Sequence, residues 1–292
     1  FYFVICYFST MKKYFCFLLF FNTICVSAQI VKLQLLSKTD NAPIQYASVI
    51  LLKSKFGMYS DEFGKVEIAL PLDDSLAISC IGYETLTLST KKIKNHSEVF
   101  LQPKFYELGE TVVKEKKEKY KVYKVGSYWD KQKRYLKPVI GTQWAILLKN
   151  IYQREGNIDS IFLKFLKGSQ TKDSRIMIRL YTVDSGCDCP GIEILQQAIV
   201  RDIKPHQSDV TINVLDKNIK FSNEGIFISL EILGFVNNGV YEPIKFGYNV
   251  EPVLALSKES SEYDNWVKTP FKKQWERFFV KNKLMFGATI FY

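Results

Sequence analysis

The feature that most constrains this chain is a two-residue alternation of apolar and polar side chains, which begins after Gln29. In residues 65–70, branched apolar residues alternate with smaller or charged ones, and residues 76–81 and 85–89 repeat the pattern. Successive side chains of a β-strand point to opposite faces of its sheet, so this period predicts strands with one buried and one wetter face. Glycine, asparagine and aspartate separate these runs at short intervals, which is typical of a β-sandwich.

A second block of strand patterns starts near residue 141 and continues to the end of the 292-residue chain. A chain of this length suffices for about two domains, each with its own core. We therefore predict an all-β protein in which an N-terminal β-sandwich is followed by a second, antiparallel β-sandwich. The strands expected in the second sandwich are residues 160–166, 175–183, 210–214, 225–233, 244–250 and 284–292. A helical turn around residues 143–153 is the one helical candidate.

The predicted organisation has four parts. They are residues 1–28, upstream residues and a signal peptide; 29–103, the first sandwich; 104–139, a charged connector; and 140–292, the second sandwich. The first part has the order of a secretory signal peptide, with Lys12 and Lys13, an apolar stretch over residues 14–24, and small residues before a cut after Ala28. The apolar stretch is shorter than the roughly 20 residues of a membrane span. The apolar residues 1–8 leave a membrane anchor as the alternative interpretation, but a cleaved leader predicts an exported protein.

The connector is rich in lysine. Between residues 114 and 137 basic residues outnumber acidic ones, and several tyrosines and Trp129 lie among them. Lysines interleaved with aromatic residues are typical of single-stranded nucleic-acid binding, but export argues against this partner. We expect a solvated connector or a short charged helix instead. The formal charge, +10 for the chain and +8 without the two leader lysines, is compatible with an anionic polysaccharide or lipid head groups as partners.

Three cysteines remain once the signal peptide is removed: Cys80, Cys187 and Cys189. An odd number does not fit a disulfide-stapled scaffold. Cys80 lies on the apolar face of its predicted strand, where a free cysteine acts as a small buried residue. Cys187 and Cys189 have three open interpretations. They form an oxidised pair, which export favours, or two soft ligands of an incomplete metal site, or free thiols in a loop.

Several short motifs follow one another in the first predicted sandwich. They are Pro43-Ile44, Ala47-Ser48-Val49, the SDEFGKV stretch of residues 60–66, Leu76 to Ser79, and the IGYE stretch of residues 81–84. In this order they resemble the carboxypeptidase regulatory-like domain, a transthyretin-like β-sandwich common in envelope proteins of Gram-negative bacteria. The resemblance covers residues 29–103 and implies a location in the periplasm, the outer membrane or the cell surface. Residues 140–292 look like the jelly-roll-like sandwich that often follows this domain.

The acidic pair Asp61 and Glu62 lies in the corner that this resemblance identifies. Asp61 is expected to close a turn on the backbone, and Gly64 to supply the positive φ that returns the chain to the next strand. Neighbouring side chains in a turn point apart, whereas a glycosidase needs two carboxylates that flank one bond. We therefore interpret this pair as a strand connection.

Catalytic patterns are missing from the sequence. Two histidines, His96 and His206, remain after the signal peptide, and no HExxH motif provides the ligands of a catalytic zinc. A GxSxG nucleophile elbow and an EF-hand-type calcium loop are also absent. We expect neither enzymatic activity nor a cofactor. A hydrolase with dispersed carboxylates in the second sandwich is the least favoured alternative.

These observations lead to one main hypothesis: a non-catalytic, exported binding or interaction module of the bacterial cell envelope, whose partner is an envelope protein or a glycan. Association with the membrane surface is compatible with this. Carbohydrate binding by the second sandwich is an alternative, in which loop aromatics stack on sugar rings. The candidates are Trp129, Tyr241, Tyr263 and Trp266. A further alternative is an accessory role in outer-membrane nutrient uptake, because regulatory-like domains often precede such receptors.

Overall fold

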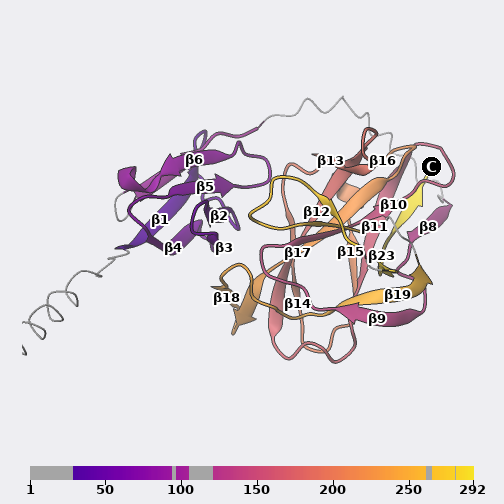
Figure 1. Cartoon of the computed structure of the whole chain (residues 1–292). Coiled ribbons are helices and arrows are strands. Elements are labelled where there is room, and N and C mark those ends of the chain that lie inside the picture. The colour runs from indigo at the N-terminus through magenta and orange to yellow at the C-terminus, as the bar shows by residue number, and fades with distance from the viewer. Residues whose placement is uncertain (1–28, 94–96, 105–120, 261–264, 280) are drawn as a thin grey trace, which may run out of the picture.

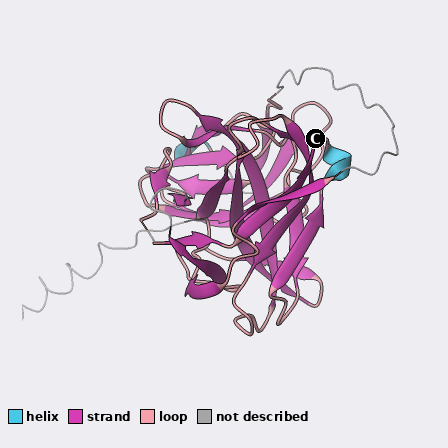
Figure 2. Ribbon diagram, turned by 90° about the vertical axis from the view of Figure 1, so that its right-hand side faces the viewer, coloured by secondary structure: helices cyan, strands magenta, loops and turns pink. Residues whose placement is uncertain are grey.

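The computed structural model describes residues 29–93, 97–104, 121–260, 265–279 and 281–292. The predicted signal peptide lies outside the described residues. The described chain is all-β, as the sequence predicts. In Figure 1 a smaller group of strands, indigo to purple, lies beside a larger group coloured magenta to yellow. Figure 2 shows the molecule turned by 90°, with strands making up most of the ribbon.

Two sheets form the first sandwich. One contains β4 (Lys65–Leu70), β1 (Gln29–Ser37) and β7 (Ser97–Leu101), in this order. The other contains β3 (Phe56–Tyr59), β2 (Ser48–Leu51), β5 (Ser75–Ser79) and β6 (Leu86–Ser89). The strand pairs are antiparallel, except that β1 and β7 are parallel. On β4, Val66, Ile68 and Leu70 are buried and their neighbours are exposed, so the alternation in sequence becomes one core-facing side.

The corner before β4 has the structure that its sequence predicts. The Asp61 carboxylate accepts hydrogen bonds from the backbone N–H of Phe63 at 2.9 Å and of Lys65 at 2.7 Å. Gly64 has a φ of +73°, and an added Cβ would lie 2.6 Å from the carbonyl oxygen of Leu35. Only glycine fits here without moving the backbone, because an L side chain would be strained and would also clash.

The second sandwich is built on an eight-stranded sheet. Its main order is β13 (Cys189–Glu193), β12 (Asp173–Asp184), β17 (Ile226–Asn237), β10 (Gln143–Leu148), β20 (Asn265–Lys268) and β21 (Glu276–Arg277). In addition, β14 (Ile199–Ile203) pairs with β12, and β18 (Val240–Pro243) pairs with β17. These pairs are antiparallel, as predicted for this sandwich.

A five-stranded sheet opposes this one. It contains β15 (Asp209–Asn213), β11 (Gly156–Lys164), β23 (Phe286–Phe291) and β8 (Val122–Gly126), with β16 (Lys220–Phe221) also beside β11. A small sheet of β22 (Asn282–Leu284), β19 (Leu254–Ser260) and β9 (Gln132–Leu136) completes the sandwich. Among the described residues, the helical elements are the 3-10 turns η1 (Thr90–Lys92) and η2 (Leu215–Lys217). In the described part of the chain, none of the helices has the length and apolarity needed to cross a bilayer.

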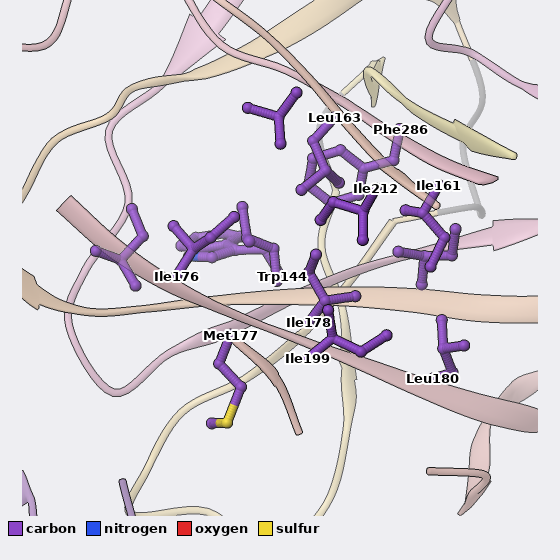
Figure 3. Close-up of a cluster of buried hydrophobic side chains, with 14 of the residues drawn as sticks. Trp144, Ile161, Leu163, Ile176, Met177, Ile178, Leu180, Ile199, Ile212 and Phe286 are labelled. Atoms are coloured by element: carbon purple, nitrogen blue, oxygen red, sulfur yellow. The ribbon is translucent and has the colours of Figure 1, made fainter. Parts of the chain in front are cut away.

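The main core lies between the eight-stranded and the five-stranded sheets. Figure 3 shows Ile178 and Leu180 of β12 gathered with Ile161 and Leu163 of β11 and with Phe286 of β23. All five side chains are fully buried. Burial of a large apolar side chain contributes roughly 1.5–3 kcal/mol, so this layer holds the two sheets together.

Two expectations about secondary structure are wrong. Residues 143–148 form the central strand β10 rather than a helical turn. Because both faces of β10 are covered, its apolar run has no alternation, and periodicity cannot identify it as a strand. Residues 244–250 do not form a regular strand and contain one isolated bridge, between Asn249 and Val139. Gly247 has a φ of +94°, which is incompatible with an extended ladder.

The expected connector is also shorter than predicted on its C-terminal side. Residues 105–120 lie outside the described residues, but β8 and β9, both within the predicted 104–139 connector, are strands of the second sandwich. β8 pairs with β23, and β9 pairs with β19. Lysine-rich composition hid these strands, because both lie at a sheet edge, where charged residues are favoured.

The four-stranded sheet of the first sandwich packs against the second sandwich. On β2, Val49 belongs to the core of the first sandwich, whereas the adjacent Ile50 joins the core cluster of the second. The ring of Tyr59 on β3 lies 4.8 Å from the ring of Phe246, measured between centroids. The backbone N–H of Phe246 donates to the carbonyl of Gly57 at 2.8 Å. An added Cβ at Gly57 would lie 2.6 Å from the Phe246 ring, so the contact depends on this glycine.

Candidate binding cavity between the two sandwiches

A cavity of about 370 Å³ lies where the two sandwiches meet. The first sandwich contributes Ser48, Tyr59 and the turn of residues 79–83. The eight-stranded sheet contributes polar side chains from four adjacent strands. They are Arg179 of β12, Glu231 of β17, Gln143 of β10 and Lys268 of β20. The volume falls within the range of small-molecule sites, which is about 300–1,000 Å³.

The period of the strands explains why polar side chains gather on this face. On β17, Ile228 and Leu230 point into the main core, so Glu231 points to the opposite face of the sheet. On β12, Ile178 and Leu180 point into the core, so Arg179 also faces outward. The first sandwich covers this outward face, which makes it a second interior rather than a solvated surface.

Arg179 is the centre of an ionic network in this cavity. Its Nε and Nη2 donate to the two oxygens of Glu193, at 2.6 and 2.8 Å. Its Nη1 donates to Glu231 at 3.0 Å. The Glu231 side chain is only 3% exposed. Buried charges need this degree of pairing, because an unpaired charge in a protein interior is strongly destabilising.

The network crosses from one sandwich to the other through a tyrosine. The Tyr59 hydroxyl donates to the second oxygen of Glu231 at 2.5 Å. Burial and the adjacent Glu231 carboxylate raise the pKa of Tyr59 well above its usual value, so the hydroxyl keeps its proton and remains the donor. The two sandwiches therefore share a fixed arrangement of charges.

β10 and β20 form the floor of the cavity beside this network. Two side chains on them carry hydrogen-bond donors that no described residue accepts. Gln143 accepts a hydrogen bond from the Tyr181 hydroxyl at 2.7 Å through its carbonyl oxygen. Lys268 forms no hydrogen bond or ion pair with any residue that the structure describes, and its ammonium lies 5.8 Å from the centre of the Trp275 ring. Burial and the positive charge of Arg179 lower the pKa of Lys268, against the opposing effect of Glu231 and Glu193.

Cys80 lines the same cavity, and its thiol keeps its proton. Burial raises the pKa of its thiol to about 12. The thiol also donates to the carbonyl oxygen of Gln45 at 3.7 Å. Since the thiolate is the reactive species, the raised pKa disfavours nucleophilic attack by this thiol at neutral pH. A neighbouring hollow of about 470 Å³ shares Gln45, Cys80 and the turn after it, and extends the cavity along the junction.

A cation–aromatic cluster holds the junction beside the cavity. Arg175 of β12 donates to the hydroxyl of Tyr46 at 2.6 Å and to Glu62 at 2.7 Å, both in the first sandwich. Two further bonds join it to Asp202, at 2.6 and 2.9 Å. Its guanidinium lies 5.6 Å from the ring centres of both Tyr46 and Tyr241. Glu62, which the sequence places in a simple corner, thus also binds the second sandwich.

The prediction that Tyr241 and Trp266 stack on a ligand is wrong. Tyr241 is buried, donates to the carbonyl of Leu233 at 3.0 Å, and packs its ring edge-on against Tyr46. Trp266 is buried beside Phe227. A sugar ring needs an accessible aromatic face, so neither residue is available for stacking.

The other two candidates have different outcomes. Trp129 is half-buried on the outer side of the five-stranded sheet, next to Tyr128 and Phe162. Tyr263 lies outside the described residues. The structure therefore does not bring the four aromatic candidates together in one site.

Cys187 and Cys189 are joined by a disulfide in the turn between β12 and β13. The carboxylate of Asp184 lies near them, with the three potential ligand atoms within 4.8 Å of one another. Sulfur binds metal as a thiolate, so this cluster could hold an ion only after reduction. Among the interpretations of the pair, the structure corresponds to the oxidised one.

The candidate site residues that sequence reasoning missed are Arg179, Gln143, Glu231 and Lys268. The sequence contained one signal for this group of residues. Glu231 interrupts the apolar run of residues 226–233, IFISLEIL, where a charge is unexpected in a strand with two covered faces. Its partners come from strands distant in sequence, so their grouping was not visible.

Comparison with known proteins adds little to this geometry. No protein-family model and no curated protein matches the chain. Among solved structures, a crystal structure of a DUF3823 family protein from Bacteroides ovatus aligns with 9% identity over 87% of this chain and 99% of that chain, with a TM-score of 0.18. A structure of infectious bursal disease virus, Gx strain, aligns with 7% identity over 84% of this chain and 60% of that chain, also with a TM-score of 0.18. At these scores neither structure supports an argument about function.

Proposed function

We propose that this chain is a non-catalytic, exported binding module of a Gram-negative bacterial envelope, and that it binds its ligand in the cavity between the two sandwiches. The location and the regulatory-like character of the first sandwich rest on the leader and on the motifs of residues 42–89. The observation that carries the binding function is the polar cavity itself, with its paired charges fixed in advance. Preorganised polar groups in a concave site favour specific binding. The partner is an envelope glycan or a segment of an envelope protein.

The two acids of the cavity argue for binding rather than hydrolysis. Glu193 and Glu231 converge on one guanidinium, and each already uses both oxygens, on Arg179 or on Tyr59. A hydrolase needs one carboxylic acid that is free to protonate the leaving group and one carboxylate that attacks or activates water. Neither acid is free for such a role.

Arrays of bacterial glycans and of envelope-derived peptides test this proposal, with the chain from Gln29 onward as the probe. Thr85 is exposed and lines the cavity, so Thr85→Trp should block its mouth while leaving the fold intact. Thr87→Trp is the matched control, because Thr87 is exposed but does not line the cavity. We expect the ligand to bind to the wild type and to Thr87→Trp, and to be lost in Thr85→Trp. Equal binding by both variants would place the site elsewhere, and cleavage of a ligand that stops in Glu193→Gln would contradict a non-catalytic role.

Carbohydrate binding by the second sandwich is the second candidate, and the surroundings of Trp129 favour it. Its ring lies 5.3 Å from the rings of both Tyr128 and Phe162. Lys124 and Lys164 place their ammonium groups 5.4 Å from the ring of Trp129 and 4.7 Å from that of Tyr128. Aromatic faces beside cations suit an acidic glycan. In this case Trp129→Ala should abolish glycan binding, whereas Tyr248→Ala, at another exposed aromatic residue, should not.

A further inference from the structure

The floor of the cavity carries two adjacent donor groups for which the described residues provide no acceptor. Gln143 and Lys268 are directly opposite each other on the antiparallel strands β10 and β20. Side chains of such a pair start about 4.5–5.5 Å apart at Cβ and lie on the same face of the sheet. Both line the cavity.

Neither donor has a hydrogen-bond acceptor among the described residues, although the Lys268 ammonium lies 5.8 Å from the centre of the Trp275 ring. The carbonyl oxygen of Gln143 is engaged by Tyr181, which directs the amide N–H groups away from that bond. No acceptor for this amide, and no carboxylate partner for Lys268, occurs among the residues that the structure describes. The two nearby acids are committed to Arg179. Unpaired polar groups in a partly buried site are costly, unless a ligand completes them.

The charge of the cavity lining also favours a ligand that accepts hydrogen bonds. Its lining contains the cations Lys104, Arg179, Lys268 and Lys272, against the anions Glu193 and Glu231. Arg179 pairs with both acids, so these three groups together keep one negative charge, and Lys272 pairs with Glu276 outside the cavity. Lys104 and Lys268 add two positive charges, so the lining has one positive charge in excess, which favours an anionic ligand.

The remaining lining indicates what kind of anion fits. Hydroxyl groups of Ser48, Ser79, Thr85 and Thr269 surround the cavity. A polyhydroxylated ligand matches these groups, whereas a fatty acid does not. The volume of about 370 Å³ accommodates one or two sugar rings rather than a folded partner.

We propose that the cavity binds a carboxylate-bearing sugar, whose carboxylate lies between the Lys268 ammonium and the Gln143 side-chain amide. This inference rests on the proposed function, because it names the ligand class of the same cavity. A carboxylate bonded to an ammonium and an amide forms charge-assisted bonds of the strong kind. It would also offset the cost of keeping Lys268 charged in a partly buried position beside Arg179, because burial and Arg179 both lower the pKa of this lysine in the ligand-free protein.

Titration calorimetry with matched sugars tests the inference on the full mature chain. The acidic probes are galacturonate, glucuronate and N-acetylneuraminate. The neutral counterparts are galactose, glucose and the methyl ester of galacturonate. Oligogalacturonides show whether the protein prefers a free sugar or the end of a polymer. We expect an acidic probe to bind at least tenfold more tightly than its neutral counterpart. Lys268→Met should remove this preference, and Lys268→Arg should keep part of it. Lys220→Met, at an exposed lysine far from the cavity lining, should behave as the wild type.

The outcomes separate this inference from the proposed function. If acidic and neutral sugars bind equally, or if Lys268→Met retains the preference, the carboxylate site is wrong, and a loss of binding in Thr85→Trp still supports the cavity as the binding site. If none of the acidic sugars binds, the inference is overturned, while the array experiment decides the proposed function. Thermal unfolding of Lys268→Met verifies that the variant is folded.

Discussion

At the scale of single residues, Lys268 keeps a positive charge at a place where burial and Arg179 disfavour it. Its ammonium is partly buried and unpaired among the described residues, and Arg179 in the same cavity repels it. A lysine whose pKa is lower in the folded than in the unfolded state destabilises the fold as long as it is protonated. Residues of this kind are common at binding sites, where stability is exchanged for function.

This predicts that Lys268→Met stabilises the protein. At pH 7 we expect the free energy of unfolding to rise by about 0.5–1 kcal/mol. The gain should shrink as the pH rises through the folded pKa of Lys268 towards the ordinary value of a lysine, because the wild-type side chain then loses its charge in the folded state. Urea denaturation of both proteins at pH 7 and pH 10 measures the difference. A variant that is less stable at pH 7 would mean that Lys268 has a structural partner.

At the scale of elements, the turn between β4 and β5 depends on one buried carboxylate. Asp74 accepts hydrogen bonds from the backbone N–H of Lys53 at 2.9 Å, of Ser54 at 2.9 Å and of Ser75 at 2.6 Å. The Ser54 hydroxyl donates a further bond at 2.7 Å. The structure buries Asp74, with 4% of its surface exposed. This residue joins the ends of β2, β4 and β5.

Acid should therefore loosen the first sandwich. Burial alone would raise the pKa of Asp74, but the hydrogen bonds from Ser54, Lys53 and Ser75 lower it to about 2. A carboxylate with a depressed pKa stabilises the fold above its unfolded pKa, and this contribution is lost as the pH falls from about 4 towards 2. It amounts to at most about 2 kcal/mol. In urea unfolding, wild type and Asp74→Asn should differ at pH 6 and converge near pH 2; a constant difference would contradict this role.

The elements also show which structural features sequence patterns can predict and which they cannot. Alternation identified β4, and the turn residues Asp61 and Gly64 were assigned correctly, because a single strand and its corner are local structures. β10 was missed, since a strand with two buried faces has no alternation. β8 was missed because its lysines resemble a solvated linker. In both cases the pairing of the strand depends on neighbours that lie far away in sequence.

At the scale of the whole molecule, Arg175 connects the two sandwiches. Its guanidinium joins Tyr46 and Glu62 of the first sandwich to Asp202 of the second. The Arg175 side chain is 12% exposed, so these bonds are shielded from solvent. Together with the contact between Tyr59 and Phe246, they fix the walls of the cavity relative to each other.

Loss of this contact should separate the two halves. Arg175→Met leaves Glu62 and Asp202 without their shared partner, and we expect it to cost about 1.5–3 kcal/mol. Calorimetry should then show two unfolding transitions instead of one, and small-angle scattering should show a larger radius of gyration. Arg201→Met is the control, because Arg201 is exposed on the adjacent strand β14. A single unchanged transition in Arg175→Met would show that the sandwiches do not depend on this residue.

The sequence by itself determined that the chain is all-β and where several of its turns lie, because alternation and turn chemistry act over a few residues. Only the tertiary structure decided where the cavity is and which side chains line it. Arg179, Glu231, Gln143 and Lys268 meet because β12, β17, β10 and β20 are neighbours in one sheet, although they are far apart along the chain. That order, and the covering of the outer face by the first sandwich, come from the burial of apolar surface by the chain as a whole.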